Sequence, residues 1–189
     1  MNVISRILNE PSIARGDYVF DSDHMFFSDY SKRLAESLDE INWTEVLQLS
    51  KELLSAKIRG SRIFLCGNGG SAANANHIAN DLVYAVTERT GFGFDAISLT
   101  ANSAVLTCLA NDVGYENVFS EQLAVSGREN DLLLVLSGSG NSKNILNALI
   151  MAKKMGMRTS AILGFDGGTC KAITDLPVHV EVNDMQISE

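Results

Sequence analysis

The chain has no block of lysine and arginine residues. Its 15 basic residues are outnumbered by 23 acidic ones, which gives a formal net charge of −8 at pH 7. Proteins that bind nucleic acid through its backbone need clustered cations to displace the phosphate counterions. The sequence therefore argues against a nucleic-acid partner, whereas a pocket for one small phosphorylated molecule stays open.

Long apolar runs are missing as well. No stretch has the roughly 20 consecutive apolar residues that a membrane-spanning helix needs. The first ten residues, MNVISRILNE, lack the basic start and the apolar core of a secretion signal. We therefore expect a soluble, cytoplasmic protein without a membrane partner.

Cysteines are few and far apart. The three of them, Cys66, Cys108 and Cys170, are odd in number and form no C-x-x-C pair. This spacing favours neither a disulfide framework nor a zinc cluster. We expect three buried thiols in a reducing compartment.

The length of 189 residues and the hydrophobic content of 46% suit one globular domain. Apolar residues recur at helical spacing over residues 27–54, with a break near residues 39–42, which predicts two amphipathic helices. We expect residues 27–189 to form the domain. Residues 1–26 form an extension for which an extra helix, an arm over a neighbouring subunit and partial disorder all stay open.

After Gly60 short apolar segments rich in strand formers alternate with segments of helical pattern. This alternation predicts an α/β fold with a parallel sheet. The expected strands are RIFLC, FDAIS, DLLLVLS, TSAILG and PVHVEV, and the expected helices span residues 71–87, 101–109, 117–125, 142–155 and 168–173.

Two loops of similar composition follow two of these strands. GNGGS occupies residues 67–71 and SGSGNS occupies residues 137–142, each at the carboxyl end of a strand, where parallel α/β sheets bind ligands. Glycines let backbone N–H groups approach an anion, serines add hydroxyl donors, and a helix start adds partial positive charge. Such loops hold a phosphate without lysine or arginine.

An alternative is that both loops are ordinary turns, with Ser71 and Ser142 as helix N-caps. Neither loop matches G-x-x-x-x-G-K-[ST] or G-x-G-x-x-G, so we expect no nucleotide cofactor. The presence of two such loops favours a single phosphorylated, polyhydroxylated ligand.

Several motifs together resemble one family. They are GNGGS leading into a helix with His77, NDVGYENVFSEQL, LSGSGNS, GFDGG and the closing NDMQ. In this combination the chain resembles SIS (sugar isomerase) domains and, more closely, the phosphoheptose isomerases. The resemblance implies a flavodoxin-like three-layer α/β/α sandwich with a five-stranded parallel sheet, N-terminal helices used in a homotetramer, and active sites at subunit interfaces.

The resemblance also implies an activity. It is the aldose–ketose isomerisation of sedoheptulose 7-phosphate to D-glycero-D-manno-heptose 7-phosphate, which supplies heptose for lipopolysaccharide or capsule. Two alternatives stay open. One is a non-catalytic SIS protein that binds sugar phosphates as a regulator or binds a replication initiator, and the other is an isomerase or lyase for a different sugar phosphate.

For substrate binding the resemblance implies residues from both loops, from the NDVGYEN segment and from the end of the chain. They are Asn68, Gly69, Ser71, Asp112, Ser137, Ser139, Ser142, Asn183 and Gln186.

The expected catalytic pair is His77 and Asp81. Isomerisation through an enediol needs a base that removes a C–H proton and a group that stabilises the oxyanion. Residues four apart on a helix share one face, and a helix that starts at a phosphate loop overlooks the bound sugar. We expect Asp81 to be the general base. The alternatives are a helix-face histidine bonded to a neighbour and a solvated or intersubunit carboxylate.

The resemblance further implies zinc binding by His77 and Gln186 in some members. With Asp81 these residues offer one nitrogen and two oxygen donors, as catalytic zinc sites use.

The chain departs from the family's pattern at several positions. Asp81 replaces a glutamate, Gly138 replaces a threonine, and Asn183 replaces an aspartate. The resemblance implies a C-terminal helix with a second catalytic histidine, and the sequence stops at Glu189 before any such helix. The GFDGG turn could line the rim of the pocket or only close the last βα unit, and we favour the second role. We expect His24 and His179 to have surface or packing roles.

Overall fold

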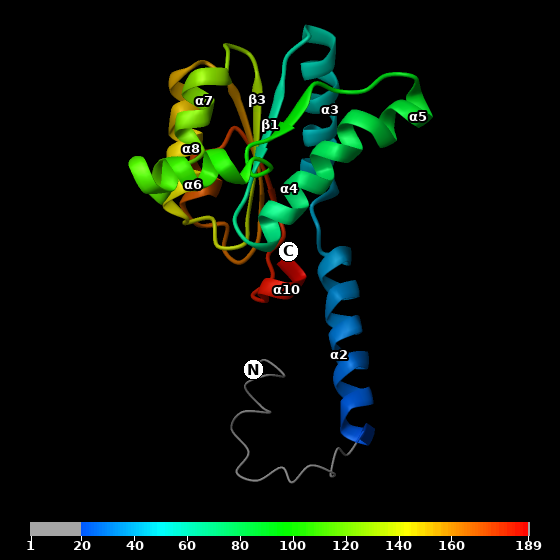
Figure 1. Cartoon of the computed structure of the whole chain (residues 1–189). Helices are drawn as coiled ribbons and strands as arrows, with labels where there is room; N and C mark the ends of the chain where they lie inside the picture. The colour runs from blue at the N-terminus through cyan, green and yellow to red at the C-terminus, as the bar shows by residue number, and fades with distance from the viewer. Residues whose placement is uncertain (1–19, 189) are drawn as a thin grey trace. The chain divides into compact units, whose positions relative to one another are not determined.

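The structure is a computed structural model of the chain that describes residues 20–188, and Figure 1 shows the order of its elements. The chain divides into two compact units, one up to Leu38 and one from Asp39 on. The described residues of the first unit belong to α2 (Phe20–Asp39). The expectations for residues 1–19 lie outside the described residues.

The two predicted N-terminal helices are present. α2 starts earlier than predicted, at Phe20, and α3 (Trp43–Arg59) follows the break near residues 39–42. The break coincides with the start of α3, where the Asn42 side chain accepts a hydrogen bond from the backbone N–H of Thr44 at 3.1 Å. A side-chain cap of this kind favours a new helix start over continuation of the old helix.

The second unit contains a parallel sheet with the strand order β2-β1-β3-β4-β5, which confirms the predicted α/β fold. The strands are β1 (Ile63–Cys66), β2 (Ala96–Ser98), β3 (Leu132–Ser137), β4 (Arg158–Leu163) and β5 (Leu176–His179). Every pairing is parallel. The order reverses between β1 and β3, which creates a topological switch point.

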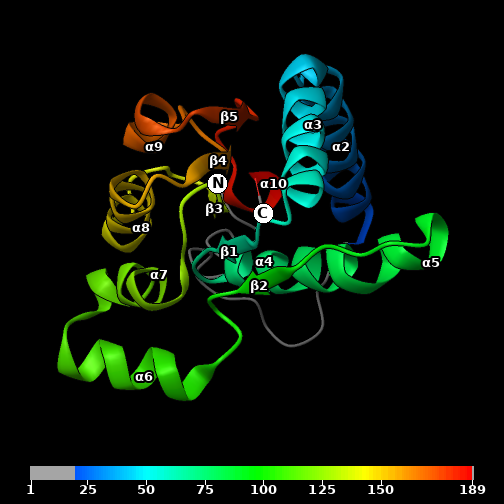
Figure 2. The same cartoon turned by 90° about the horizontal axis from the view of Figure 1, so that it is seen from above.

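Helices cover both faces of this sheet. Figure 2 shows α3 and α4 on one side of the strands and α7, α8 and α9 on the other, which makes three layers. The remaining helical elements have these bounds: α4 (Gly70–Asn80), the π-helix η1 (Asp81–Ala85), α5 (Val86–Thr90), α6 (Ser103–Asp112), the 3₁₀ turn η2 (Tyr115–Asn117), α7 (Ser120–Ser126), α8 (Lys143–Lys154), α9 (Gly168–Ile173) and α10 (Met185–Ser188).

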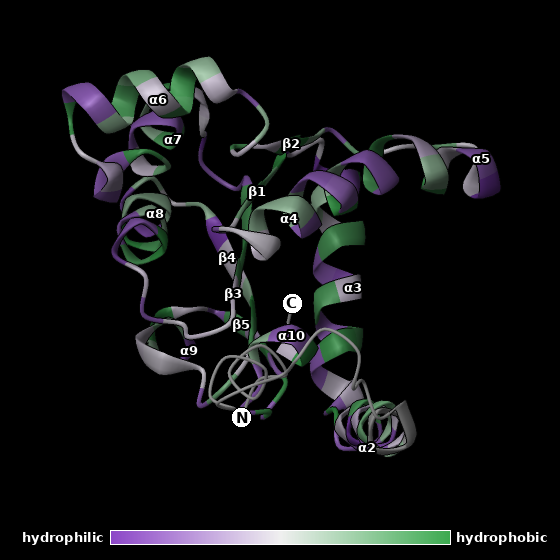
Figure 3. Cartoon of the chain, turned by 60° about the horizontal axis from the view of Figure 1, so that its bottom comes forward, coloured by the Kyte–Doolittle hydropathy of each residue, from purple (hydrophilic) through white to green (hydrophobic). Residues whose placement is uncertain are grey.

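Two apolar cores lie on the two faces of the sheet. Alternate residues of β1 enter different cores: Phe64 and Cys66 pack with residues of α7 and α8, whereas Ile63 and Leu65 pack with residues of α3 and α4. Because both faces are covered, β1 and β3 consist of buried residues only, and Figure 3 shows both strands in the hydrophobic colour. This explains why these strands read as continuous apolar runs in the sequence.

Some element ends differ from the predictions. The helix expected over residues 117–125 starts later, as α7 at Ser120, and Asn117 instead ends the 3₁₀ turn η2. β5 ends at His179 although the pattern PVHVEV continues. The helix predicted over residues 71–87 changes into a π-helix at Asp81 and ends at Thr90. Phe94, expected in a strand, donates its backbone N–H to the carbonyl of Leu82 in this π-helix at 3.0 Å, so β2 starts only at Ala96.

The expectation of three buried thiols is right for two cysteines and wrong for one. Cys66 and Cys170 are buried and free, whereas Cys108 is free but exposed on α6. Burial raises the pKa of the Cys66 thiol, and it raises the pKa of Cys170 to about 11. Both buried thiols are therefore poor nucleophiles at neutral pH. Among the described residues no helix is both long and apolar enough to cross a membrane.

Candidate functional site

Two loops meet at one edge of the sheet. The first loop, residues 67–71, leads from β1 into α4, and the second loop, residues 137–142, leads from β3 into α8. β1 and β3 are neighbours, while β2 lies on the far side of β1, so both loops lie at the switch point of the sheet. Open α/β sheets bind ligands at this point. The two predicted phosphate loops therefore share the expected ligand position.

The helices after both loops start without a side-chain cap. α4 starts after Gly69, whose φ of 58° and ψ of −123° are strained for any residue other than glycine. α8 starts after Ser142, whose side chain makes no capping hydrogen bond. Ser71 is itself inside α4, and Ser142 occupies the N-cap position of α8 without a capping hydrogen bond, so neither serine side chain caps a helix as the alternative interpretation required. Both helix starts present backbone N–H groups and partial positive charge to this edge.

A cluster of three polar side chains joins the two loops. Asn68 Nδ2 donates to Asn144 Oδ1 at 2.9 Å, and Asn144 Nδ2 donates back to Asn68 Oδ1 at 2.8 Å. The hydroxyl of Tyr115 donates to the same Asn68 Oδ1 at 2.8 Å. We call Asn68, Asn144 and Tyr115 the amide cluster. It connects the first loop, the first turn of α8 and the segment that follows Asp112.

The second loop is held by its own hydrogen bonds and by the turn after β4. Ser137 Oγ accepts a hydrogen bond from the backbone N–H of Gly140 at 3.1 Å. Asn141 Oδ1 accepts from the backbone N–H and from the hydroxyl of Thr169, both at 2.9 Å. Gly140 has a φ of 63°, and a Cβ atom there would overlap the carbonyl oxygen of Gly167. Close backbone packing therefore determines the path of this loop.

The serines predicted to bind phosphate differ in exposure. Ser71 and Ser137 are buried, Ser142 is half-buried and Ser139 is exposed. Of these, the Ser137 oxygen already accepts a hydrogen bond within the loop, and its hydroxyl hydrogen stays available to an anion.

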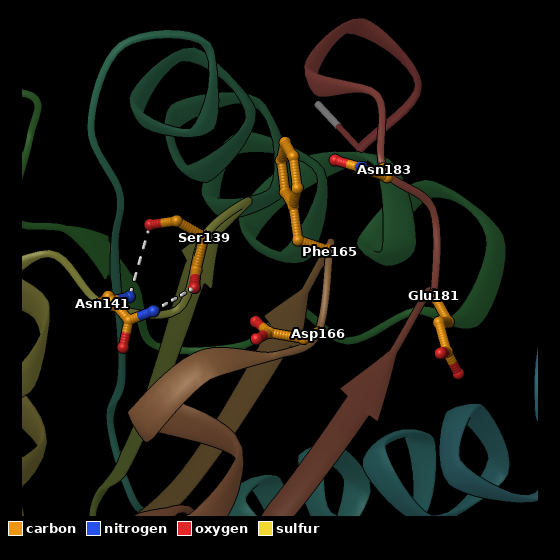
Figure 4. Close-up of a pocket in the computed structure, with 6 residues that line it drawn as sticks. All are labelled: Ser139, Asn141, Phe165, Asp166, Glu181 and Asn183. Atoms are coloured by element: carbon orange, nitrogen blue, oxygen red, sulfur yellow. Dashed lines mark hydrogen bonds between the residues drawn. The ribbon is translucent and has the colours of Figure 1, made fainter.

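A pocket of about 590 Å³ opens beyond the carboxyl ends of β3, β4 and β5 (Figure 4). The segments that follow these three strands supply its lining, which is formed by Ser139, Asn141, Phe165, Asp166, Glu181 and Asn183. The sequence predicted Ser139 and Asn183 as site residues and left a place at the pocket rim open for the GFDGG turn with Phe165 and Asp166, whereas Asn141 and Glu181 were missed.

The GFDGG turn lines this pocket, which corrects the expectation that it only closes the last βα unit. Phe165 and Asp166 both face the pocket, and Asp166 Oδ1 accepts from the backbone N–H of Gly168 at 3.0 Å. The carbonyl of Phe165 accepts a hydrogen bond from His179 Nε2 at 2.9 Å, and His179 Nδ1 accepts one from Lys171 Nζ at 2.9 Å. His179 therefore has a packing role, as predicted. His24 belongs to α2, and its side chain lies outside the described residues.

α10 lies against the second loop. A Cβ atom on Gly138 would come within 2.9 Å of Met185 Sδ, so glycine at this position leaves room for the methionine. Asp184 Oδ1 accepts a hydrogen bond from the backbone N–H of Gln186 at 3.0 Å and so caps α10. Gln186 itself is exposed on this short helix.

His77 and Asp81 form a pair on the helix that leaves the first loop. His77 Nε2 lies 3.4 Å from Asp81 Oδ2, and Asn80 Nδ2 donates to Asp81 Oδ1 at 3.4 Å. The two side chains thus share one face, as their spacing predicted. Their side chains are 76% and 45% exposed, so the carboxylate is accessible to a ligand, and the pair adds little to stability.

Asp112 ends α6 and is exposed. Its Oδ2 accepts a hydrogen bond from Cys108 Sγ at 3.4 Å, and its Oδ1 accepts one from Asn111 Nδ2 at 2.7 Å. The hydrogen bond to this carboxylate raises the pKa of the Cys108 thiol. Through Tyr115 the segment that carries Asp112 reaches the amide cluster, whereas no described contact joins Gln186 to His77.

Comparison with known proteins agrees with this architecture. The family model of the SIS domain matches residues 26–164. The phosphoheptose isomerase of Chlorobium phaeobacteroides is 42% identical over 157 residues, which cover 82% of this chain and 69% of that protein. The phosphoheptose isomerase of Helicobacter pylori is 39% identical over 161 residues, which cover 84% of this chain and 81% of that protein.

Among solved structures, the phosphoheptose isomerase from Neisseria gonorrhoeae superimposes with a TM-score of 0.80 at 30% identity, covering 90% of each chain. The chain belongs to the SIS domain family and, within it, to the phosphoheptose isomerases.

Proposed function

We propose that the chain isomerises sedoheptulose 7-phosphate to D-glycero-D-manno-heptose 7-phosphate. The observation that carries the proposal is the pair of uncapped helix starts at the switch point, joined through Asn68 and Asn144, in a member of the phosphoheptose isomerase family. This arrangement offers a phosphate site without cations, and it directs the helix with His77 and Asp81 away from that site.

The phosphate of the substrate binds to the starts of α4 and α8. Backbone N–H groups of both helices donate to its oxygens, and the hydroxyls of Ser137, Ser139 and Ser142 add donors. Gly69 and Ser71 belong to the same helix start. The sugar hydroxyls are bound by exposed polar groups at this edge, for which we propose Asp112, Asn183 and Gln186.

Asp81 acts as the general base. Its carboxylate removes a proton from C1 of the ketose, the electrons of that C–H bond form the enediol, and the protonated Asp81, after exchange with solvent, returns a proton to C2 to give the aldose. His77 orients the Asp81 carboxylate, gives a proton to the oxygen on C2 as charge develops there, and takes up the hydroxyl proton of C1 when the aldehyde forms. The product then serves heptose supply for lipopolysaccharide or capsule.

The described residues do not complete a zinc site. His77 and Asp81 offer one nitrogen and one carboxylate group near each other, but a catalytic zinc takes about three protein ligands. Within residues 20–188 no group of three or more His, Cys, Asp or Glu side chains gathers in this way, and Gln186 has no described contact with the pair. We therefore derive no step through a metal, and we propose no nucleotide cofactor.

We further propose a cytoplasmic homotetramer with its active sites at subunit interfaces. An apolar stripe on α3 supports self-association, because its large side chains recur on one face and are 46–78% exposed; they are Trp43, Leu47, Leu54 and Ile58. Three cysteines that form no disulfide suit a reducing compartment.

The decisive experiment is turnover of sedoheptulose 7-phosphate by the purified chain in D₂O. An enediol route predicts the aldose product with solvent deuterium at C2, detected by NMR, both with and without added zinc. Binding of the sugar phosphate without conversion under either condition would contradict the proposal and favour a non-catalytic binding protein.

A further inference from the structure

Asn68 uses most of its hydrogen-bonding capacity inside the protein. Its Oδ1 accepts two hydrogen bonds, from Asn144 Nδ2 and from the Tyr115 hydroxyl, and its Nδ2 donates one to Asn144 Oδ1. An amide oxygen has two lone pairs, so Asn68 has no acceptor capacity left and keeps one N–H for a ligand. Its side chain is therefore a bridge between segments as well as a candidate ligand contact.

Asn144 is the buried end of this bridge. It is 3% exposed, and its Oδ1 also accepts from the backbone N–H of Ile145 at 3.0 Å. Two antiparallel amide hydrogen bonds fix both the distance and the orientation of the groups that they join. The pair thereby sets the first loop against the first turn of α8, although Asn68 and Asn144 are 76 residues apart in the sequence.

Tyr115 is the exposed end. Its side chain is 57% exposed, yet its hydroxyl reaches Asn68 from η2. A second tie keeps η2 on α8, because Asn147 Nδ2 donates to the carbonyl of Glu116 at 2.9 Å. Because this second hydrogen bond holds η2 on α8, removal of the Tyr115 hydroxyl should weaken the hydrogen bonding of Asn68 without unfolding η2.

We propose that Tyr115 and Asn144 are positioning residues which, through Asn68, hold the starts of α4 and α8 at the spacing that one phosphate group needs. The inference rests on the proposed function, because it concerns the phosphate end of that site. When the bridge weakens, the two helix starts no longer donate to the same anion, and binding of the phosphate becomes weaker in the ground state and in the transition state alike.

The test is Tyr115→Phe, with Tyr84→Phe as the matched control, since Tyr84 is 67% exposed and no described contact involves its hydroxyl. Loss of one neutral hydrogen bond predicts a Kd for inorganic phosphate about 3- to 10-fold higher. We expect KM for the sugar phosphate to rise by the same factor while kcat stays within about twofold, as for uniform binding. The melting temperature should match that of the wild type.

A second variant tests the buried end. Asn144→Asp keeps the size of the side chain but places an oxygen against Asn68 Oδ1, so we expect phosphate binding to weaken by more than about 10-fold. In an Asn68→Ala background, Tyr115→Phe should have no further effect on the phosphate Kd, because a residue that acts through Asn68 has nothing left to act on.

Three results would overturn the inference. They are an unchanged phosphate Kd in Tyr115→Phe, a lower melting temperature without a change in Kd, and a full additional effect of Tyr115→Phe in the Asn68→Ala background. A wild type that does not bind inorganic phosphate would overturn it as well. A wild type that binds phosphate but does not isomerise the sugar removes the proposed function alone, and the phosphate measurements still decide the role of Tyr115.

Discussion

The first and second loops have similar sequences and equivalent places, but different interactions hold them. Side chains join the first loop to other segments, because Asn68 bonds to Asn144 and Tyr115. Close backbone packing in this loop is local: a Cβ atom on Gly67 would overlap the carbonyl of Ser71 in the same loop, and one on Gly69 would meet no neighbouring atom. Backbone packing joins the second loop to the turn after β4, because a Cβ atom on Gly140 would overlap the carbonyl oxygen of Gly167, and the hydrogen bonds of Asn141 with Thr169 add to this contact.

The helices that follow the two loops differ as well. The helix after the first loop carries the exposed pair His77 and Asp81, whereas the helix after the second loop buries Asn144 and a series of apolar residues. The two loops therefore differ both in the contacts that hold them and in the side chains that their helices present. The second loop packs against the turn after β4, whereas the first loop is joined to α8 and η2 by hydrogen bonds and leads into the helix that carries the proposed catalytic pair.

The largest effect is expected for Asp81→Asn. If the helix after the first loop supplies the general base, kcat should fall by about 10²–10⁴-fold, with a much smaller change in KM. Steady-state kinetics with sedoheptulose 7-phosphate measures both parameters. Glu88→Gln, an equivalent change at an exposed position of α5, is the control and should leave kcat unchanged. A kcat near the wild-type value in Asp81→Asn would remove Asp81 from the mechanism.

The next largest effect separates the two loops directly. Gly140→Ala combines a positive φ with an overlap against backbone, so we expect the free energy of unfolding to drop by about 3 kcal/mol. Gly69→Ala meets only backbone strain and should cost about 1–2 kcal/mol. Urea unfolding of both variants measures the difference. Equal losses would show that backbone packing does not distinguish the loops.

A smaller effect is expected for Gly138→Thr. The new Cβ would come within 2.9 Å of Met185 Sδ and 3.6 Å of Phe165 Cε2. Met185 is 39% exposed and able to move aside, so we expect a loss of about 1 kcal/mol in the free energy of unfolding. Met185→Ala should relieve that loss in the double variant. Strictly additive losses would mean that the two side chains do not compete for this space.

The smallest effect concerns the opposite edge of the sheet. Asp175 accepts hydrogen bonds from Thr159 and Lys153; partial burial raises its pKa, but these bonds outweigh burial and hold the pKa below the ordinary value of 3.8. Because the pKa is lower in the folded state, ionised Asp175 stabilises the fold above about pH 3.8, and this contribution is lost as the pH falls through the folded-state pKa.

Asp175→Asn should therefore flatten the acid side of the stability–pH profile, as followed by thermal unfolding between about pH 5 and pH 3. Activity at neutral pH should not change, because both loops lie at the other edge. A loss of activity at neutral pH would show that the two edges are coupled.

Local sequence patterns were sufficient to predict the sheet, the two Gly- and Ser-rich loops, and the position of His77 and Asp81 on one face of a helix. Each of these depends on residues that are close in the chain: apolar runs, a turn after a strand, and a spacing of four on a helix. The sequence also left a place at the pocket rim open for the GFDGG turn, and this turn, capped by Asp166, does line the pocket. No such signal marks Glu181, and Tyr115 lies in the NDVGYENVFSEQL motif without a predicted role of its own.

By itself, then, the sequence determined the α/β fold, the places of the two loops and the family to which the motifs belong. Only the tertiary structure decided that Asn68 bonds to Asn144 and Tyr115, that Glu181 and Phe165 share a pocket, and that Cys108 is exposed. The physical reason is distance along the chain. These contacts form between segments that the strand order β2-β1-β3-β4-β5 brings together, and that order results from packing both faces of the sheet at once.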